Sequence, residues 1–176
     1  VPTTASLGNG ISLKSNLYWA TSKGMKRFFK ELPDWKLLVS HIDFNDDILE
    51  RVIFRKKFKN NAIVYLIADA YRGDRMAACL DTYFNSLAGV IKDSTSIDEI
   101  KIGINGNADL IAFNGHNGLM DEQTNHSNSV DGIERDAVAI ACASGPYFRD
   151  KYVKTHSYPL VTTTDLLYPG AFILEG

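Results

Sequence analysis

Two residues of this chain have the chemistry of a nucleophile and of a proton carrier. His116 follows the apolar run 108–113 after two intervening residues, and Cys142 directly follows the run 137–141. The thiolate is the nucleophilic form of cysteine, whereas an ordinary thiol, with a pKa of about 8.5, is mostly protonated at neutral pH. A neighbouring imidazole can accept the thiol proton and later protonate a leaving amine. The pair therefore predicts nucleophilic catalysis if the fold brings the two side chains together.

The runs that precede these two residues have the pattern of buried β-strands. Each is short, apolar and rich in strand-forming residues, as are the runs 62–68 and 160–164. A helix is predicted over 75–87. Short buried strands separated by helices or long connections predict a parallel sheet with helices on both sides. Because catalytic groups gather at the carboxyl ends of such strands, we expect His116 and Cys142 on one rim if their strands are neighbours.

The first third of the chain has a less regular pattern. Residues 1–16 are rich in Gly, Ser and Asn and predict an irregular N-terminal arm. The spacing of apolar residues predicts a helix over 17–32, a strand over 35–40 and a short helix over 46–54. The basic run 55–59 is typical of a solvated helix end or loop.

The residues around the reactive pair suggest how an oxyanion would be held. Glycines near His116 allow the backbone to approach a substrate closely, and the N–H of Gly118 is the candidate oxyanion donor. The amide of Cys142 is a second candidate. Pro146 fits the first residue of a helix. A helix N-terminus at that place would lower the pKa of the Cys142 thiol.

Three polar residues are candidates for orienting the catalytic groups or binding the substrate. Asp69 follows the first predicted strand, where it either orients His116, recognises a basic substrate group or caps a turn. Asn114 is placed to hydrogen-bond the imidazole, although a turn residue before a glycine needs no catalytic role. Ser144 comes two residues after the candidate nucleophile, near the start of the expected helix.

A strand that ends in His-Gly, followed by a second strand that ends in Ala-Cys, resembles the cysteine peptidases related to caspases, legumain, gingipain and clostripain. The matching residues are His116 and Ala141-Cys142, and the resemblance covers about residues 60–165. Asn117 stands where the family usually has glycine directly after histidine. The resemblance implies a three-layer α/β/α sandwich with a mostly parallel sheet. It also implies peptide-bond cleavage by Cys142 with His116 as general acid and base, with no metal and no organic cofactor.

A second resemblance covers two short segments of the chain. Residues 16–19 and 115–121 are similar to segments of an uncharacterised bacterial protein family. This resemblance implies no activity.

Two other classes of function stay open. The first is a catalytically inactive binding or regulatory module of the same fold, which predicts an ordinary thiol at Cys142. The second is a zinc-dependent hydrolase, because His116, Asp121 and His126 recur at five-residue intervals and Asp131 follows. Their spacing matches neither a helical His-x-x-x-His pair nor a paired-cysteine site.

Composition narrows the expected partners. A chain of 176 residues with 45% hydrophobic and 23% charged residues is typical of a single globular domain, which we expect over 1–176. A net charge of −2, from 19 Lys and Arg against 21 Asp and Glu, disfavours general binding to nucleic acid. No apolar run approaches the ~18 residues of a membrane helix. We therefore expect a peptide or protein substrate, and neither nucleic acid nor a membrane.

The cysteines and the first residues indicate the compartment. Two cysteines are too few for a disulfide framework, and Cys79 fits a core position of the 75–87 helix. Free thiols predict a cytoplasmic protein. The chain starts at Val1 with neither an initiator Met nor the features of a secretory signal, so we expect that it was processed or trimmed.

Overall fold

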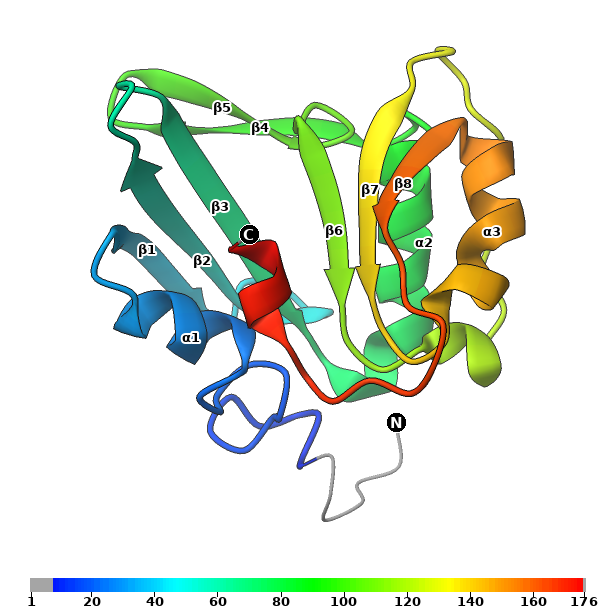
Figure 1. Cartoon of the computed structure of the whole chain (residues 1–176), viewed down its shortest axis with the longest axis horizontal. Coiled ribbons are helices and arrows are strands. Elements are labelled where there is room, and N and C mark those ends of the chain that lie inside the picture. The colour runs from blue at the N-terminus through cyan, green and yellow to red at the C-terminus, as the bar shows by residue number, and fades with distance from the viewer. Residues whose placement is uncertain (1–7, 176) are drawn as a thin grey trace. The chain divides into compact units, whose positions relative to one another are not determined.

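The computed structural model describes residues 8–175, which form a mixed α/β protein as predicted (Figure 1). In chain order the elements are α1 (Met25–Glu31), β1 (Trp35–Ile42), β2 (Ile48–Lys57), β3 (Ile63–Tyr71), η1 (Gly73–Arg75), α2 (Met76–Leu87), β4 (Lys92–Ile97), β5 (Ile100–Asn105), β6 (Leu110–Asn114), η2 (Gly118–Met120), β7 (Arg135–Ile140), α3 (Ser144–Thr155), β8 (Ser157–Val161) and η3 (Ala171–Leu174).

These elements divide into two compact units. The first contains the described residues up to Met76 together with those from Pro169 onward, and the second is Ala77–Tyr168. That all 176 residues form one domain stays a prediction.

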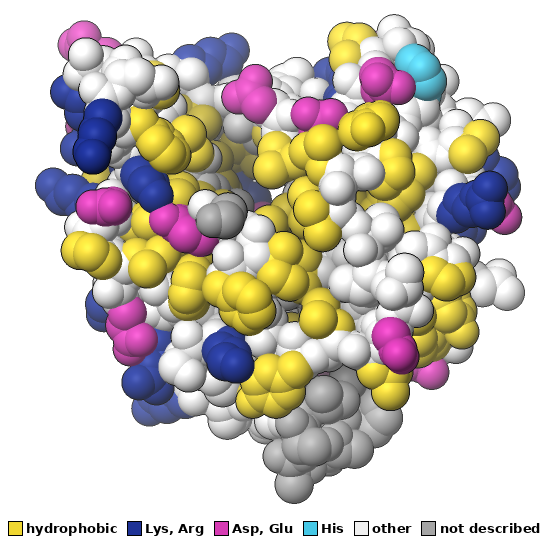
Figure 2. All heavy atoms as spheres, viewed as in Figure 1, with side chains coloured by type: hydrophobic (Ala, Val, Ile, Leu, Met, Phe, Trp, Pro, Cys, Tyr) yellow, Lys and Arg dark blue, Asp and Glu magenta, His cyan; other side chains and the backbone are white. Residues whose placement is uncertain are grey.

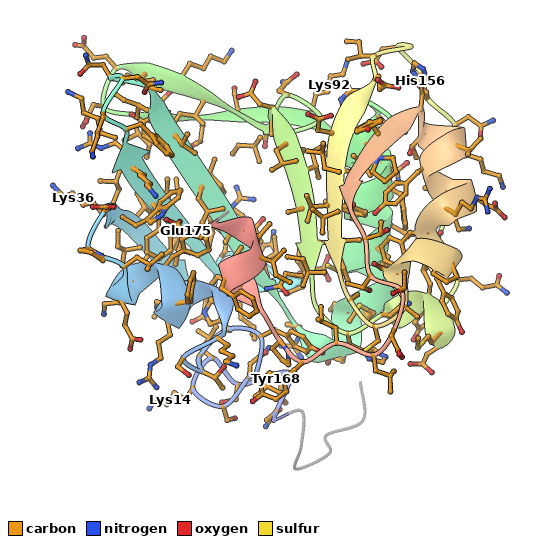
Figure 3. All side chains as sticks on the ribbon, viewed as in Figure 1. Lys14, Lys36, Lys92, His156, Tyr168 and Glu175 are labelled. Carbon is orange, nitrogen blue, oxygen red and sulfur yellow. The ribbon has the colours of Figure 1, made fainter. Side chains whose placement is uncertain are left out.

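The first unit is built on an antiparallel sheet in the order β1-β2-β3. One face of β2 from Ile48 to Phe54 is buried, as expected for a strand that packs on a core, and Ile53 of the other face is also buried. Helix α1 packs on this core through Phe29, whose ring contacts those of Trp35 and Phe54. The C-terminal η3 joins the same core. Glu175, labelled in Figure 3, accepts hydrogen bonds of 2.5 Å from Trp35 Nε1 and Lys56 Nζ.

The prediction of a helix over 46–54 is wrong, because these residues enter β2. The buried row of β2 includes Glu50, which is fully buried and breaks the apolar alternation by which a strand is recognised. Glu50 accepts hydrogen bonds from Trp19 Nε1, Lys26 Nζ and Ser40 Oγ. Burial raises the pKa of Glu50, but these hydrogen bonds, led by that of Lys26, outweigh burial and hold the pKa below its usual value.

Three other predictions for this unit need correction. The basic run 55–59 begins as the end of β2 and is not a helix end. The strand predicted over 62–68 is confirmed as β3, but it pairs antiparallel with β2, and Ile63 is 46% exposed. The helix predicted over 17–32 begins only at Met25. The chain folds back at Gly24, where a Cβ atom would lie 2.6 Å from the backbone of Trp19.

The strand over 35–40 is confirmed as β1. The expected arm 1–16 is described only from Gly8, since residues 1–7 lie outside the described residues, and 8–16 form turns. No helix among residues 8–175 is long and apolar enough to cross a membrane.

The second unit contains the predicted parallel sheet, in the order β6-β7-β8. The strands predicted over 108–113 and 137–141 and the helix predicted over 75–87 are confirmed to within a few residues. The strand predicted over 160–164 lies earlier, as β8. The antiparallel hairpin of β4 and β5 was not predicted, because residues 92–97 are mostly polar.

Helices α2 and α3 lie on the same face of this sheet. Tyr83 of α2 and Phe148 of α3 contact each other, and both contact Phe113 of β6. The Tyr83 hydroxyl also donates to the backbone carbonyl of Val138 on β7, over 3.0 Å. In the described part of this unit, the expectation of helices on both sides of the parallel sheet is therefore wrong.

Candidate functional site

The candidate catalytic residues follow adjacent parallel strands. In the register of β6 and β7, Asn114 pairs with Ile140, and the N–H of Gly115 donates to the carbonyl of Ile140 over 3.1 Å. His116 and Cys142 each come two residues after this pair. The expectation that their strands are neighbours and end at the same edge is confirmed.

Asn117 links the loop of His116 to the turn of Cys142. Its side chain is fully buried, and its Nδ2 donates to the backbone carbonyl of Cys142 over 2.7 Å. Its Oδ1 accepts from the N–H of Leu119 over 3.1 Å, which caps the short helix η2. Sequence reasoning missed this residue, although its position between histidine and Gly118 was the available signal.

The turn that carries Cys142 has an unusual backbone. Ala143 lies in the left-handed region with φ 47° and ψ 39°, a conformation that is uncommon for residues other than glycine. Helix α3 begins at the next residue, Ser144, whose hydroxyl donates to the carbonyl of Ala139 over 2.7 Å. Cys142 therefore lies on a sharp strand-to-helix turn that Ser144 ties back to β7.

The Cys142 thiol is held by the backbone of Leu167. The N–H of Leu167 donates to Sγ over 3.3 Å, and Sγ donates to the carbonyl of Leu167 over 3.6 Å. The preceding segment is fastened along the same turn, since the Asp165 carbonyl accepts from the N–H of Ala143 over 2.9 Å. We call residues 163–167 the covering segment. Tyr168, labelled in Figure 3, follows it directly.

Thr163 anchors the covering segment to the start of α3. Its carbonyl accepts from the N–H of Gly145, and its hydroxyl accepts from the N–H of Ser144. The same hydroxyl donates to the carbonyl of Ala141. The first amides of the helix are therefore already paired with the protein's own chain.

His116 is partly buried and is bound to a carboxylate. Its Nε2 lies 2.8 Å from Oδ2 of Asp121, and the side chains of the two residues are 22% and 63% exposed. This contact leaves Nδ1 as the ring nitrogen available to another group. Among residues 8–175 no hydrogen bond joins His116 to Cys142, so each has a different partner in this structure.

The two candidate oxyanion donors have no protein acceptor within the described chain. The carbonyl of Gly118 accepts from Asp121 and Glu122, but the N–H of Gly118 donates to none of residues 8–175. The same holds for the N–H of Cys142. Both amides belong to the two segments that Asn117 joins.

The remaining predicted site residues have different surroundings. The Ser144 hydroxyl is engaged by Ala139 and Thr163 and holds the turn. Asn114 Oδ1 is buried and has no hydrogen-bond partner among the described residues. Asp69 belongs to the first unit, where Arg51 binds its carboxylate through two hydrogen bonds of 2.6 and 2.7 Å.

The residues of the hypothetical zinc site are not arranged as a ligand set. No group of three or more His, Cys, Asp or Glu side chains in the described part of the chain is placed to hold a metal ion. His126 instead lies against the ring of Phe84, and its Nδ1 is 2.9 Å from the Thr124 hydroxyl. Burial, and then the nearby Lys151 and Lys154, lower the pKa of His126. Asp131 pairs with basic residues outside this loop.

Two hollows lie in the second unit. One, of about 230 Å³, is formed by the loop after η2 and by α3, with lining residues Leu119, Glu122, Gln123, Thr124, Tyr147 and Lys151. The other, of about 280 Å³, lies where β6 and β7 begin, the edge at which Figure 3 labels Lys92. The first hollow lies closer to the loops that follow β6 and β7, but neither His116 nor Cys142 lines either hollow.

Comparison with protein-family models, with curated proteins and with solved structures finds no match to this chain.

Proposed function

We propose that this protein is a cysteine peptidase or amidase whose nucleophile is Cys142 and whose general acid and base is His116. The observation that carries the proposal is the hydrogen bond from the buried Asn117 to the carbonyl of Cys142, which fixes the loop of His116 against the turn of the thiol. In this proposal the reaction needs no metal or organic cofactor.

The proposed reaction passes through an acyl-enzyme. His116 accepts the thiol proton, and Sγ of Cys142 attacks the carbonyl carbon of the scissile amide. In the proposal, the oxyanion that forms accepts hydrogen bonds from the N–H groups of Gly118 and Cys142, which have no acceptor among residues 8–175. The protonated imidazole gives its proton to the leaving amine as the C–N bond breaks. A water molecule, deprotonated by His116, then hydrolyses the thioester and restores the thiol.

Asp121 and α3 have supporting roles in this proposal. A carboxylate on Nε2 holds the imidazole in one orientation, which leaves Nδ1 for the exchange of protons with the thiol. The positive end of the α3 dipole begins two residues after Cys142 and favours the thiolate.

The covering segment must leave before a substrate can reach the thiol. The backbone N–H and carbonyl of Leu167 occupy the surroundings of Sγ. A peptide substrate carries the same two groups, so it can replace these contacts as the covering segment withdraws. The structure corresponds, in this account, to a resting state.

One observation favours the second candidate, a binding or regulatory module without turnover. The thiol is paired with Leu167 and not with His116. If the covering segment never leaves, the chain retains the fold and loses the reaction.

Turnover of a mixture of internally quenched peptides tests the proposal. We expect cleavage by the wild-type chain and a loss of at least about a thousandfold in Cys142→Ala, as for removal of a catalytic nucleophile. Cys79→Ala, which changes a cysteine on α2, is the matched control and keeps the activity. Cleavage that persists in Cys142→Ala contradicts the assignment, and wild type that cleaves no peptide favours the binding module.

A further inference from the structure

The basic run 55–59 is divided between the two faces of the first sheet. Lys56 lies on the core face, where its Nζ is 2.5 Å from the carboxylate of Glu175. Arg55 and Lys57 point to the opposite face, because consecutive residues of a strand alternate between faces. Neither of them makes an ion pair within residues 8–175. The positive charge of the run is therefore neutralised on one face and left free on the other.

Two further lysines add to this free positive charge. Lys36 is opposite Arg55 in the register of β1 and β2, and its side chain extends away from the sheet in Figure 3. Lys59 follows β2 in the turn that leads to β3. Both lysines make no ion pair in the described part of the chain, and neither does Asp34, the acidic residue just before β1. We call these two lysines, together with Arg55 and Lys57, the four free cations.

The two compact units differ in the sign of their net charge. The sequence of the first unit, 1–76 with 169–176, contains 13 Lys and Arg against 9 Asp and Glu. That of the second unit, 77–168, contains 6 Lys and Arg against 12 Asp and Glu. The net charge of −2 for the whole chain therefore combines +4 with −6. An asymmetry of this kind indicates an anionic partner for the basic unit, which the total charge conceals.

Every residue from 57 to 64, at the turn between β2 and β3, is exposed, and we call this segment the hairpin tip. Phe58, Ile63 and Val64 in it are large and apolar, and they are 42%, 46% and 42% exposed. Ile63 and Val64 are consecutive in β3 and therefore point to opposite faces. A partner that lies on one face covers only one of them, whereas a fluid interface into which the tip is inserted surrounds both. Figure 2 shows Lys and Arg side chains next to hydrophobic ones over this end of the first unit.

The hairpin tip is ordered by its own backbone. The N–H of Phe58 donates to the carbonyl of Ala62 over 2.8 Å, and the N–H of Asn61 donates to the carbonyl of Phe58 over 3.0 Å. Asn61 has a φ of 66°, in the left-handed region that asparagine occupies more readily than most residues. A partner therefore meets a fixed turn, and binding does not require that a loop first become ordered.

We propose that the hairpin tip binds an anionic membrane surface, with Phe58, Ile63 and Val64 inserted among the lipid headgroups and the four free cations on the anionic groups of the lipids. Interfacial binding strengthens with the apolar area that is buried and with the attraction of Lys and Arg to anionic lipids. It needs no membrane-spanning helix. The proposal concerns the first unit and does not depend on the proposed reaction.

Two other anionic partners fit the hairpin tip less well. A single strand of nucleic acid stacks its bases on aromatic rings. The ring of Phe58 already has the Lys56 ammonium at 5.0 Å, and Tyr65, the next aromatic residue along β3, is half-buried. Stacking also leaves the aliphatic Ile63 and Val64 without a role. A soluble acidic peptide pairs with the cations, but from one face of the sheet it leaves Ile63 or Val64 in water.

Co-sedimentation of the full chain with lipid vesicles tests the proposal. Vesicles of phosphatidylcholine alone are compared with vesicles that contain about one-third phosphatidylserine. We expect binding to the anionic vesicles, little binding to the neutral ones, and a loss of binding as salt is added, because salt screens the lipid charge. Absence of binding to the anionic vesicles at low salt overturns the proposal.

Matched variants separate the attraction of charges from insertion. Lys57→Gln and Lys59→Gln should each weaken binding to the anionic vesicles about fivefold, the worth of one cation near an anionic surface. Ile63→Ser should weaken it about three- to tenfold, because less apolar area is buried. The controls are Lys101→Gln on β5 and Val153→Ser on α3, both at exposed positions outside the tip, and they should leave binding unchanged.

The same variants define the results that would overturn the proposal. If Ile63→Ser binds vesicles as wild type does, no insertion takes place. If Lys101→Gln weakens binding as much as Lys57→Gln does, the hairpin tip is not the contact. Fluorescence anisotropy with oligothymidylate and with polyglutamate tests the two other partners, and binding of either polymer without binding of vesicles also overturns the proposal.

Discussion

The side-chain amide of Asn117 donates a 2.7 Å hydrogen bond to the backbone carbonyl of Cys142. Asn117 is fully buried, and it directly follows His116 in the chain. One side chain therefore connects the loop of the imidazole to the turn of the thiol and fixes the spacing of the two.

Replacing Asn117 tests this connection. Asn117→Ala leaves the carbonyl of Cys142 and the N–H of Leu119 without their partner, which should cost about 1–3 kcal/mol of unfolding free energy. Urea unfolding measures this loss. Asn125→Ala is the control, because the side chain of Asn125 is exposed and its bonds are made by its backbone. Equal stability of the two variants would show that the link is dispensable.

The left-handed residue after the nucleophile predicts an unusual response to glycine. Ala143→Gly relieves about 1–2 kcal/mol of backbone strain and costs about 0.5–1 kcal/mol in unfolded-state entropy, so a stability gain of up to about 1.5 kcal/mol is expected. Ala78→Gly, in α2, should instead lose about 0.5–1 kcal/mol. Thermal and urea unfolding compare the two. A loss in both variants would argue against the left-handed turn.

Loosening the covering segment should expose the thiol. Thr163→Val removes the hydroxyl that bonds Ala141 and Ser144, each bond being worth about 1 kcal/mol, so alkylation of Cys142 should accelerate about tenfold or more. Mass spectrometry of iodoacetamide adducts gives the rate. Thr164→Val, at the exposed neighbouring position, is the control. An unchanged rate in Thr163→Val would mean that the covering segment does not limit access.

The ion pairs of Asp131 predict how stability depends on pH. Hydrogen bonds from Arg135, and then from Lys92, hold the pKa of Asp131 well below its usual range. A depressed pKa contributes stability above the unfolded-state pKa of about 3.9, and this contribution is lost as the pH falls below it. The stability difference between wild type and Asp131→Asn should therefore be largest near neutral pH and shrink below about pH 4.

Urea midpoints measured at intervals between neutral pH and about pH 2 check this prediction. Glu99→Gln, in the exposed turn between β4 and β5, should show a small difference from wild type at every pH. A difference for Asp131→Asn that stays constant down to acid pH would contradict the assigned role of the carboxylate.

A segment of the fold was predicted correctly where its sequence shows which of its residues are buried. The strands before His116 and Cys142 were predicted because they are short runs of apolar residues, a pattern that indicates a strand without any knowledge of distant contacts. Strand β2 was mistaken for a helix because Glu50 occupies its buried row, where hydrogen bonds from Trp19, Lys26 and Ser40 satisfy its carboxylate. The hairpin β4-β5 was not predicted because the residues of β4 are mostly polar and show no alternation of apolar and polar positions.

The sequence predicts the sheet edge at which the candidate site lies, but it does not predict the contacts within the site. Parallel pairing of β6 with β7 follows from sequence pattern and general topology. The pairing of Leu167 with the thiol joins residues 25 positions apart, and no local pattern encodes it. The bond between Asn117 and Cys142 has the same separation and was overlooked for the same reason.

The pH dependence of Cys142 alkylation, in wild type and in His116→Ala, tests the central claim most directly. The account predicts labelling of Cys142 well below pH 8, where an ordinary thiol is protonated, at a rate limited by opening of the covering segment, and loss of that labelling in His116→Ala. Cys79 in the same sample is the internal reference. Labelling of Cys142 that begins only near pH 8, or that is unchanged in His116→Ala, would contradict a working Cys142–His116 pair.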